Sequence, residues 1–160
     1  MLFRSPLVKD YPNLIVARTF SKIYGMAGLR CGYCVAQEKT IERMRVHQTW
    51  DSVNIMALVA ALASLRDAAQ VEQGRRRNGE VKRFVCAELD KSGFAYIPSA
   101  ANFMMIDMRR DVKPLIAAMR QRGVEVGRFF PTLPNHMRVT VGTRADMESF
   151  LSAFRQVAAA

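Results

Sequence analysis

Residues 18–33 read Arg18-Thr19-Phe20-Ser21-Lys22-Ile23-Tyr24-Gly25-Met26-Ala27-Gly28-Leu29-Arg30-Cys31-Gly32-Tyr33. One lysine, Lys22, stands in this stretch among hydroxyl residues and glycines, and Arg30 follows it eight positions later. The stretch therefore brings an amine nucleophile, hydroxyl donors and a guanidinium into one short loop. A phosphorylated aldehyde needs these groups, because the amine attacks its carbonyl carbon and the other groups donate hydrogen bonds to its phosphate.

The residues on either side of this loop predict strands. Residues 13–17 contain a continuous apolar run without alternation, which predicts a buried strand. The residues between the loop and position 36 predict a second strand. Lys22 then follows the carboxyl end of a strand, where open α/β sheets bind their ligands.

The spacing Ser21-Lys22-x-x-Gly25-x-x-Gly28-x-Arg30-x-Gly32-Tyr33 resembles the lysine loop of pyridoxal-phosphate enzymes with the aspartate aminotransferase fold. It is most similar to the histidinol-phosphate aminotransferase-like branch of that family. The resemblance continues through residues 52–54, 98–103 and 137–143, so it covers nearly the whole chain. Residues 1–5 have no counterpart in the family pattern.

This resemblance implies an α/β fold, namely the C-terminal part of the pyridoxal-phosphate-dependent transferase (aspartate aminotransferase-like) fold. Residues 1–72 are expected to form the end of the large, cofactor-binding domain, and residues 73–160 the small C-terminal domain. Family members are much longer, and the N-terminal half that carries their other cofactor contacts does not precede Lys22 here. The resemblance further implies pyridoxal 5'-phosphate as cofactor, amino acid and keto acid substrates, and a homodimer.

The resemblance also assigns roles to individual residues. It makes Lys22 the catalytic residue, since a lysine amine can condense with the cofactor aldehyde and then move the α-proton of the substrate. It assigns Thr19, Ser21 and Arg30 to the cofactor phosphate, and Arg138 to the substrate α-carboxylate. The structural alternatives are a surface lysine, ordinary turn residues and an edge-strand charge.

Four further residues carry weaker signals. Arg128 either lines the substrate entrance or lies at a solvent-facing strand end, and Asn102 either orients Arg138 or caps a turn. His47 and His136 fit no nucleophile–base arrangement, so we expect structural roles for both.

Hydrophobic periodicity predicts the remaining elements. The helix that starts near residue 53 is apolar on most sides, so we expect it to be buried, with Ser52 as its N-cap. Gly93 is expected to end the helix at residues 67–92, and Gly123 is expected to end the helix at residues 112–122. Thr143 and Asp146 form a near capping box for the last helix. The predicted helices are 39–46, 53–65, 67–92, 112–122 and the segment after 143, and the predicted strands are 95–97, 102–108, 124–126 and 137–141.

The net charge is +10, with an arginine run at residues 75–77. A basic surface of this kind is typical of nucleic-acid binding, but Glu72 and Glu80 lie beside the run and no aromatic residues interleave with it. We interpret the run as a solvated helix face and predict no nucleic-acid partner. A second function for the arginine run is the electrostatic attraction of anionic substrates.

The cysteine spacing admits two interpretations. Cys31 and Cys34 have the spacing of a thiol-oxidoreductase pair, but the residues that follow continue an extended pattern rather than a helix. Zinc would need a second pair, and Cys86 and the two histidines stand at the wrong spacings. We therefore predict no metal site, and cysteines that pack in a reducing compartment.

The longest apolar stretch, residues 55–65, is too short to span a bilayer. No basic-then-apolar leader opens the chain, so we expect a cytoplasmic protein without membrane attachment.

The resemblance implies an aminotransferase that exchanges an amino group between an amino acid and a 2-keto acid through a lysine-bound pyridoxal phosphate. A related decarboxylase or condensing enzyme, a non-catalytic fragment of such an enzyme, and a basic nucleic-acid binder are the alternatives. The sequence leaves the amino donor open, with histidinol phosphate and aromatic amino acids as candidates.

Overall fold

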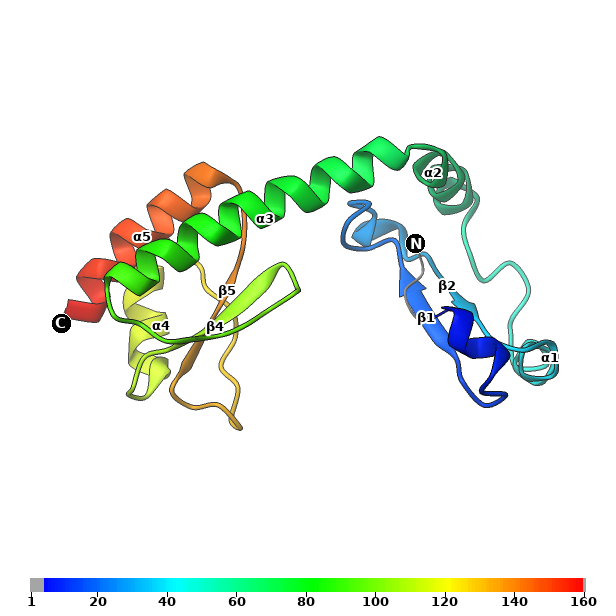
Figure 1. The fold of residues 1–160 in the computed structure, drawn as a ribbon, viewed down its shortest axis with the longest axis horizontal. Helices are drawn as coiled ribbons and strands as arrows, with labels where there is room; N and C mark the ends of the chain where they lie inside the picture. The colour runs from blue at the N-terminus through cyan, green and yellow to red at the C-terminus, as the bar shows by residue number, and fades with distance from the viewer. Residues whose placement is uncertain (1–4, 160) are drawn as a thin grey trace. The chain divides into compact units, whose positions relative to one another are not determined.

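A computed structural model describes residues 5–159, which form two compact units (Figure 1). The first unit ends at Gly74 and the second begins at Arg75. The assignment of residues 1–72 and 73–160 to the large and small domains of a longer family fold stays a prediction.

The first unit is built around a two-stranded antiparallel ribbon. Strand β1 (Val16–Thr19) pairs with β2 (Gly32–Val35), with Val16 opposite Val35 and Thr19 opposite Gly32. A Cβ on Gly32 would lie 2.7 Å from the carbonyl oxygen of Arg18, so only glycine lets the strands approach this closely. The unit's other elements are two 3-10 helices, η1 (Ser5–Lys9) and η2 (Ala27–Leu29), and the helices α1 (Glu38–Arg45) and α2 (Ile55–Arg66).

The strand–loop–strand prediction for residues 13–36 is confirmed, but the expectation that its first strand is buried is wrong. Ile15 is 44% exposed, and β1 carries no fully buried residue. A continuous apolar strand is buried only where layers cover both of its faces. Among residues 5–159, β1 pairs only with β2, and its side chains stay open to solvent.

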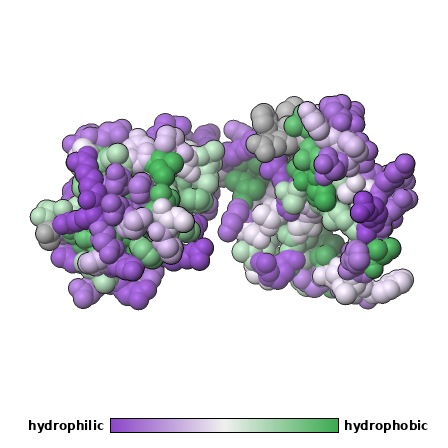
Figure 2. Space-filling view, turned by 90° about the horizontal axis from the view of Figure 1, so that it is seen from below, coloured by the Kyte–Doolittle hydropathy of each residue, from purple (hydrophilic) through white to green (hydrophobic). Residues whose placement is uncertain are grey.

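Helix α2 departs from the prediction in two ways. Its N-cap is Asn54, whose side-chain oxygen accepts a hydrogen bond from the Ala57 amide at 2.9 Å, so the assignment of Ser52 as the cap is wrong. Its expected burial is also wrong, because only Ala57 and Ala61 are buried and six large apolar side chains are exposed. These six, which we call the α2 apolar face, are Ile55, Met56, Leu58, Val59, Leu62 and Leu65. Figure 2 shows hydrophobic surface, coloured green, on both units.

Most of the hydrophobic core lies in the second unit. Helix α3 (Ala68–Lys91) leads into it, and β3 (Tyr96–Ile97), β4 (Phe103–Asp107) and β5 (His136–Thr140) form an antiparallel sheet in that order. Helices α4 (Val112–Gln121) and α5 (Arg144–Ala159) complete the unit. One face of the sheet, with Met104 and Ile106 on β4 and Met137 and Val139 on β5, packs in the same core cluster as residues of α3, α4 and α5.

The predicted elements of this unit are confirmed with one exception. Residues 124–126 do not form a strand, because only one backbone hydrogen bond ties this segment to β5, from the Gly127 amide to the Arg138 carbonyl at 2.8 Å. Gly93 and Gly123 follow α3 and α4 with φ of +71° and +75°, as expected for residues that end helices. Thr143 and Asp146 exchange the predicted capping hydrogen bonds at the start of α5.

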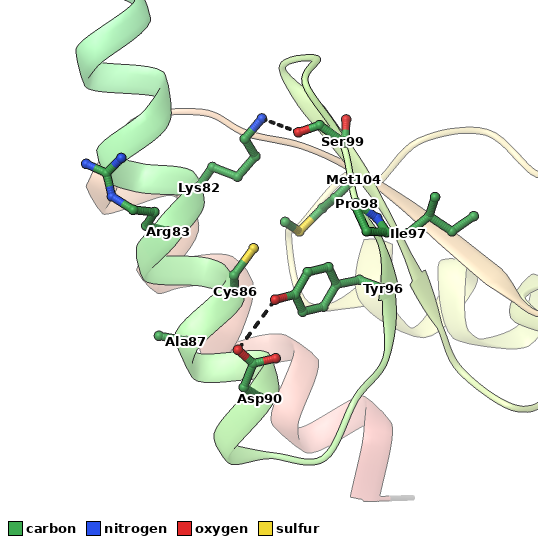
Figure 3. Close-up of a pocket in the computed structure, with 10 residues that line it drawn as sticks. All are labelled: Lys82, Arg83, Cys86, Ala87, Asp90, Tyr96, Ile97, Pro98, Ser99 and Met104. Carbon is green, nitrogen blue, oxygen red and sulfur yellow. Dashed lines mark hydrogen bonds between the residues drawn. The ribbon is translucent and has the colours of Figure 1, made fainter.

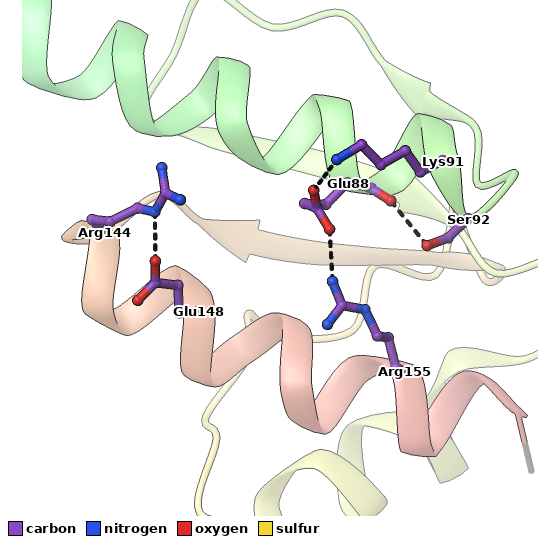
Figure 4. Close-up of polar contacts among 6 residues, drawn as sticks. All are labelled: Glu88, Lys91, Ser92, Arg144, Glu148 and Arg155. Atoms are coloured by element: carbon purple, nitrogen blue, oxygen red, sulfur yellow. Dashed lines mark hydrogen bonds and ion pairs between the residues drawn. The ribbon is translucent and has the colours of Figure 1, made fainter.

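Ionic contacts join α3 to α5 (Figure 4). Glu88 on α3 accepts hydrogen bonds from Lys91 at 2.6 Å and from Arg155 on α5 at 2.7 Å. The hydrogen bond from Lys91 and the charges of Lys91 and Arg155 lower the pKa of Glu88. Within the described part of the chain, no helix combines the length and the apolar composition that crossing a bilayer requires.

Candidate functional site

The predicted phosphate-binding hydroxyls lie together where β1 ends. Thr19 Oγ1 donates a hydrogen bond to Ser21 Oγ at 2.8 Å and accepts one from the Ser21 amide at 3.0 Å. Thr19 therefore uses its proton within the pair, and the hydroxyl proton of Ser21 is left to donate to an outside acceptor.

Backbone hydrogen bonds and the packed rings of Phe20 and Tyr24 hold the loop that carries Lys22. The Lys22 carbonyl accepts from the Gly25 amide at 2.9 Å, and Phe20 is bonded through its backbone to both Met26 and Cys31. The buried ring of Phe20 lies 5.0 Å from that of Tyr24. Lys22 itself is exposed. The amine is thus presented by a loop whose backbone is fixed.

Arg30 has an unusual backbone conformation. Its φ of 55° and ψ of 50° lie in the left-handed region, which costs energy for a residue with a Cβ. Its guanidinium donates to the Ala27 carbonyl at 2.7 Å, and Asn54 donates to the neighbouring Leu29 carbonyl at 2.9 Å. Asn54 therefore joins the end of this loop to the start of α2.

This loop suits a phosphorylated aldehyde. Ser21 has a free hydroxyl proton, Arg30 has guanidinium N–H groups beyond the one bonded to Ala27, and Lys22 offers an exposed amine. Together these groups can satisfy a phosphate and attack a carbonyl carbon. The structure brings Thr19 and Ser21 into contact and places Arg30 in the same loop, with its guanidinium bonded to Ala27 rather than to either hydroxyl.

Arg138, the predicted carboxylate-binding residue, lies on β5 in the second unit. As predicted, it shares a face of the strand with Thr140, while Met137 and Val139 face the core. Its Cζ lies 4.3 Å from the centre of the Phe103 ring, and its Nε is buried without a hydrogen-bond partner.

Two arginines of this unit lie within cation–π distance of the Phe130 ring. The Cζ atom of Arg138 is 5.8 Å from the centre of this ring and that of Arg128 is 4.8 Å from it. Arg128 is exposed. Two guanidinium groups therefore share one ring, which concentrates positive charge near this surface of the second unit.

Sequence reasoning missed three contributors to these two groups. Phe103 and Phe130 were not assigned a role, because their approach to Arg138 depends on strand register and on the path of an irregular loop. Asn54 falls within a segment that carries the resemblance, and its position before an apolar helix is the signal that could have identified it as a cap. Asn102, for which we predicted a weaker role, accepts a hydrogen bond from Val141 through its backbone carbonyl.

A separate cavity of about 500 Å³ lies between α3 and β3, and none of the predicted site residues lines it (Figure 3). Lys82 closes part of it by donating to the Ser99 carbonyl at 2.7 Å, and the Tyr96 hydroxyl donates to Asp90 at 3.4 Å. Cys86 and Tyr96 both line this cavity. The hydrogen bond with Cys86, together with burial, raises the pKa of Tyr96 to about 12.

The three cysteines are free thiols, with Cys31 buried and Cys34 and Cys86 half-buried. Over residues 5–159, no three histidine, cysteine or acidic side chains gather closely enough to hold a metal ion. The absence of a metal site stays a prediction.

Comparison with known proteins places this geometry in context. The model of the family described as aminotransferase class I and II matches residues 3–154. Histidinol-phosphate aminotransferase of Symbiobacterium thermophilum is 42% identical over 152 residues, which cover 93% of this chain and 42% of the relative. The crystal structure of histidinol-phosphate aminotransferase from Sinorhizobium meliloti in complex with pyridoxal-5'-phosphate matches with a TM-score of 0.83 at 27% identity, covering 94% of this chain and 42% of that one.

A third likeness concerns the fold alone. The crystal structure of L-threonine-O-3-phosphate decarboxylase from Porphyromonas gingivalis has a TM-score of 0.76 at 23% identity, and the match covers 95% of this chain and 49% of that one. The chain spans about two fifths of the length of the curated relatives it matches. The predicted aspartate aminotransferase-like α/β fold is confirmed, over part of its length.

Proposed function

This chain belongs to the aminotransferase class I and II family, and on that premise we propose that it acts in the exchange of an amino group between an amino acid and a 2-keto acid. The observation that carries the proposal is the hydroxyl pair of Thr19 and Ser21 at the end of β1, in the same loop as Lys22 and Arg30. We propose pyridoxal 5'-phosphate as the cofactor, as in the solved relative. When bound, this cofactor supplies an aldehyde carbon and a sink for electrons.

In this proposal the loop holds the cofactor at two points. Lys22 Nζ would be the group that holds the aldehyde end of the cofactor. Ser21 donates its free hydroxyl proton to the phosphate, and Arg30 pairs with the same phosphate through its remaining guanidinium N–H groups. The hydrogen bond that Ser21 Oγ accepts from Thr19 orients the Ser21 hydroxyl for this task.

Lys22 also moves the proton of the substrate in this scheme. Lys22 Nζ would be the base that takes the proton from the substrate Cα, and as an ammonium group it would hold that proton until it is returned. An amine on a fixed backbone suits this task, since proton transfer requires a base that stays within hydrogen-bond reach of the carbon.

Arg138 binds the anionic end of the substrate in the proposed scheme. A guanidinium can form two parallel hydrogen bonds with a carboxylate, and it can bind a phosphate in the same way. The relatives are named for histidinol phosphate, so we propose a phosphorylated amine of this kind as one partner in the exchange and an amino acid as the other. The second guanidinium, that of Arg128, supports this choice, because a phosphate carries more negative charge than a carboxylate.

A labelling experiment tests the lysine assignment. The protein is incubated with pyridoxal phosphate and reduced with borohydride, and peptides are mapped by mass spectrometry. We expect the pyridoxyl group on Lys22, and we expect Lys22→Ala to remove it. Lys39→Ala, which changes an exposed lysine of α1, is the matched control and should leave the labelling at Lys22 unchanged.

Labelling spread evenly over the surface lysines would contradict the proposed role of Lys22. In an assay with amino donors, keto-acid formation supports amino-group exchange, whereas carbon dioxide release without it would replace our proposal with a decarboxylase.

We also propose that the protein is a cytoplasmic homodimer. Free thiols are typical of a reducing compartment. The α2 apolar face supports an association surface, because exposed apolar patches of this kind mark protein–protein contacts.

A further inference from the structure

Strand pairing places Phe103 beside Arg138. In the antiparallel ladder of β4 and β5, Met105 lies opposite Arg138 and Phe103 lies opposite Thr140. Phe103 and Arg138 are therefore diagonal neighbours on the same face of the sheet, the face opposite the core. At this spacing a ring can reach the side chain of the neighbouring strand.

The guanidinium of Arg138 rests against an aromatic ring instead of an acid. Its Cζ is 4.3 Å from the centre of the Phe103 ring, which is cation–π distance. Its Nε is buried without a hydrogen-bond partner. None of the ion pairs found within the described residues includes Arg138.

Gly127 lies against the stem of the same side chain. A Cβ at Gly127 would lie 2.9 Å from both Cβ and Cγ of Arg138, and the Gly127 amide donates to the Arg138 carbonyl at 2.8 Å. The glycine therefore leaves the space that the first carbons of Arg138 occupy, and the Phe103 ring lies against the charged end of the side chain.

We infer that Phe103 is a positioning residue, which holds the Arg138 guanidinium in place for the anionic group of the substrate. This inference rests on the proposed function of Arg138. A carboxylate in the place of Phe103 would also fix the guanidinium, but it would neutralise the charge and compete with the substrate for the same N–H groups. The face of a phenyl ring attracts the cation and leaves its terminal donors free for an incoming anion.

The first test reads the contact directly and needs no activity. In NMR spectra of the purified protein, the Nε–H proton of Arg138 should be shifted upfield by the ring and should exchange slowly with water. Phe103→Leu should remove the upfield shift, and Phe103→Tyr should keep it. Phe84→Leu is the matched control, since the Phe84 ring lies 3.3 Å from Cζ of another arginine, Arg144.

The second test separates positioning from stability by steady-state kinetics. Phe103→Leu should raise KM for the amino donor roughly tenfold and change kcat by less than about threefold, because binding loses a preorganised partner. Phe103→Tyr should restore KM, and Phe84→Leu should leave it unchanged.

Two results would overturn the inference while leaving the proposed role of Arg138 in place. One is a Phe103→Leu protein with the KM of the wild type, in a background where Arg138→Lys raises KM. The other is an Arg138 Nε–H signal that does not respond to Phe103→Leu. If instead Arg138→Lys leaves KM unchanged while the NMR shifts behave as described, the substrate-binding role proposed for Arg138 fails, and the positioning role of Phe103 fails with it.

Discussion

At the scale of single residues, Arg30 shows a conflict between stability and the proposed function. Its left-handed backbone is a conformation that glycine adopts without cost and arginine does not. A glycine would be the more stable choice at this position, so the guanidinium is retained at an energetic cost. Strained residues of this kind cluster at ligand sites.

We predict that Arg30→Gly separates these two properties. Because the substitution relieves the left-handed strain, the free energy of unfolding should stay equal or rise by up to about 1 kcal/mol. The affinity for pyridoxal phosphate should fall at least roughly tenfold, because one charged phosphate partner is lost. Thermal unfolding and absorbance titration measure the two effects. A variant that binds the cofactor as tightly as the wild type would show that Arg30 does not contact the phosphate.

At the scale of elements, single side chains connect helices to parts of the chain that are distant in sequence. Asn54 caps α2 and also donates to the loop that ends at Arg30, so one side chain serves both a helix and the candidate cofactor site. Glu88 similarly links α3 to α5 through Arg155. Local patterns predicted these helices, whereas the contacts between them depend on tertiary packing.

The link through Glu88 predicts a pH dependence of stability. Lys91 and Arg155 lower its pKa in the folded state, so the folded state favours the ionised carboxylate. The resulting stability is present above the unfolded pKa of about 4.3 and is lost as the pH falls through the lower folded pKa. We expect Glu88→Gln to lower Tm by roughly 2–4 °C at pH 7.

The difference between Glu88→Gln and the wild type should then disappear in strongly acidic buffer. Glu148→Gln is the control, since Glu148 pairs with Arg144 on the same helix and joins no second element. Its effect on Tm should be smaller at pH 7. If the Tm of Glu88→Gln stayed below that of the wild type by the same amount at all pH values, the ion pairs would not be the cause.

At the scale of the whole molecule, the α2 apolar face stands out because it exposes several large apolar side chains to solvent. Its side chains are 49–69% exposed, and Trp50, just before the helix, is 97% exposed. A helix that is apolar on most sides is normally buried. The free energy gained by removing such a surface from water favours association.

We predict that this face mediates self-association. Sedimentation equilibrium at about 100 µM should find a dimer, and Leu58→Lys with Leu62→Lys should shift it toward monomer by raising Kd at least roughly tenfold. Arg66→Glu, at the polar end of α2, is the control and should leave the association state unchanged. A wild-type protein that remains monomeric at this concentration would refute the prediction.

Features that depend only on neighbouring residues could be predicted from the amino-acid sequence. These are the strand–loop–strand around Lys22, the helices that end before Gly93 and Gly123, and the face of β5 on which Arg138 lies. Helix periodicity, strand alternation and the left-handed preference of glycine act over a few residues, so they can be read from a single chain.

The three-dimensional packing of the chain sets which surfaces are buried and which side chains are in contact. It exposed β1 and α2, which the apolar pattern had predicted to be buried, and it left residues 124–126 without strand pairing. It also placed the Phe103 ring against the Arg138 guanidinium. Burial depends on what covers a surface and contact depends on strand register, and both are set by residues far apart in the chain.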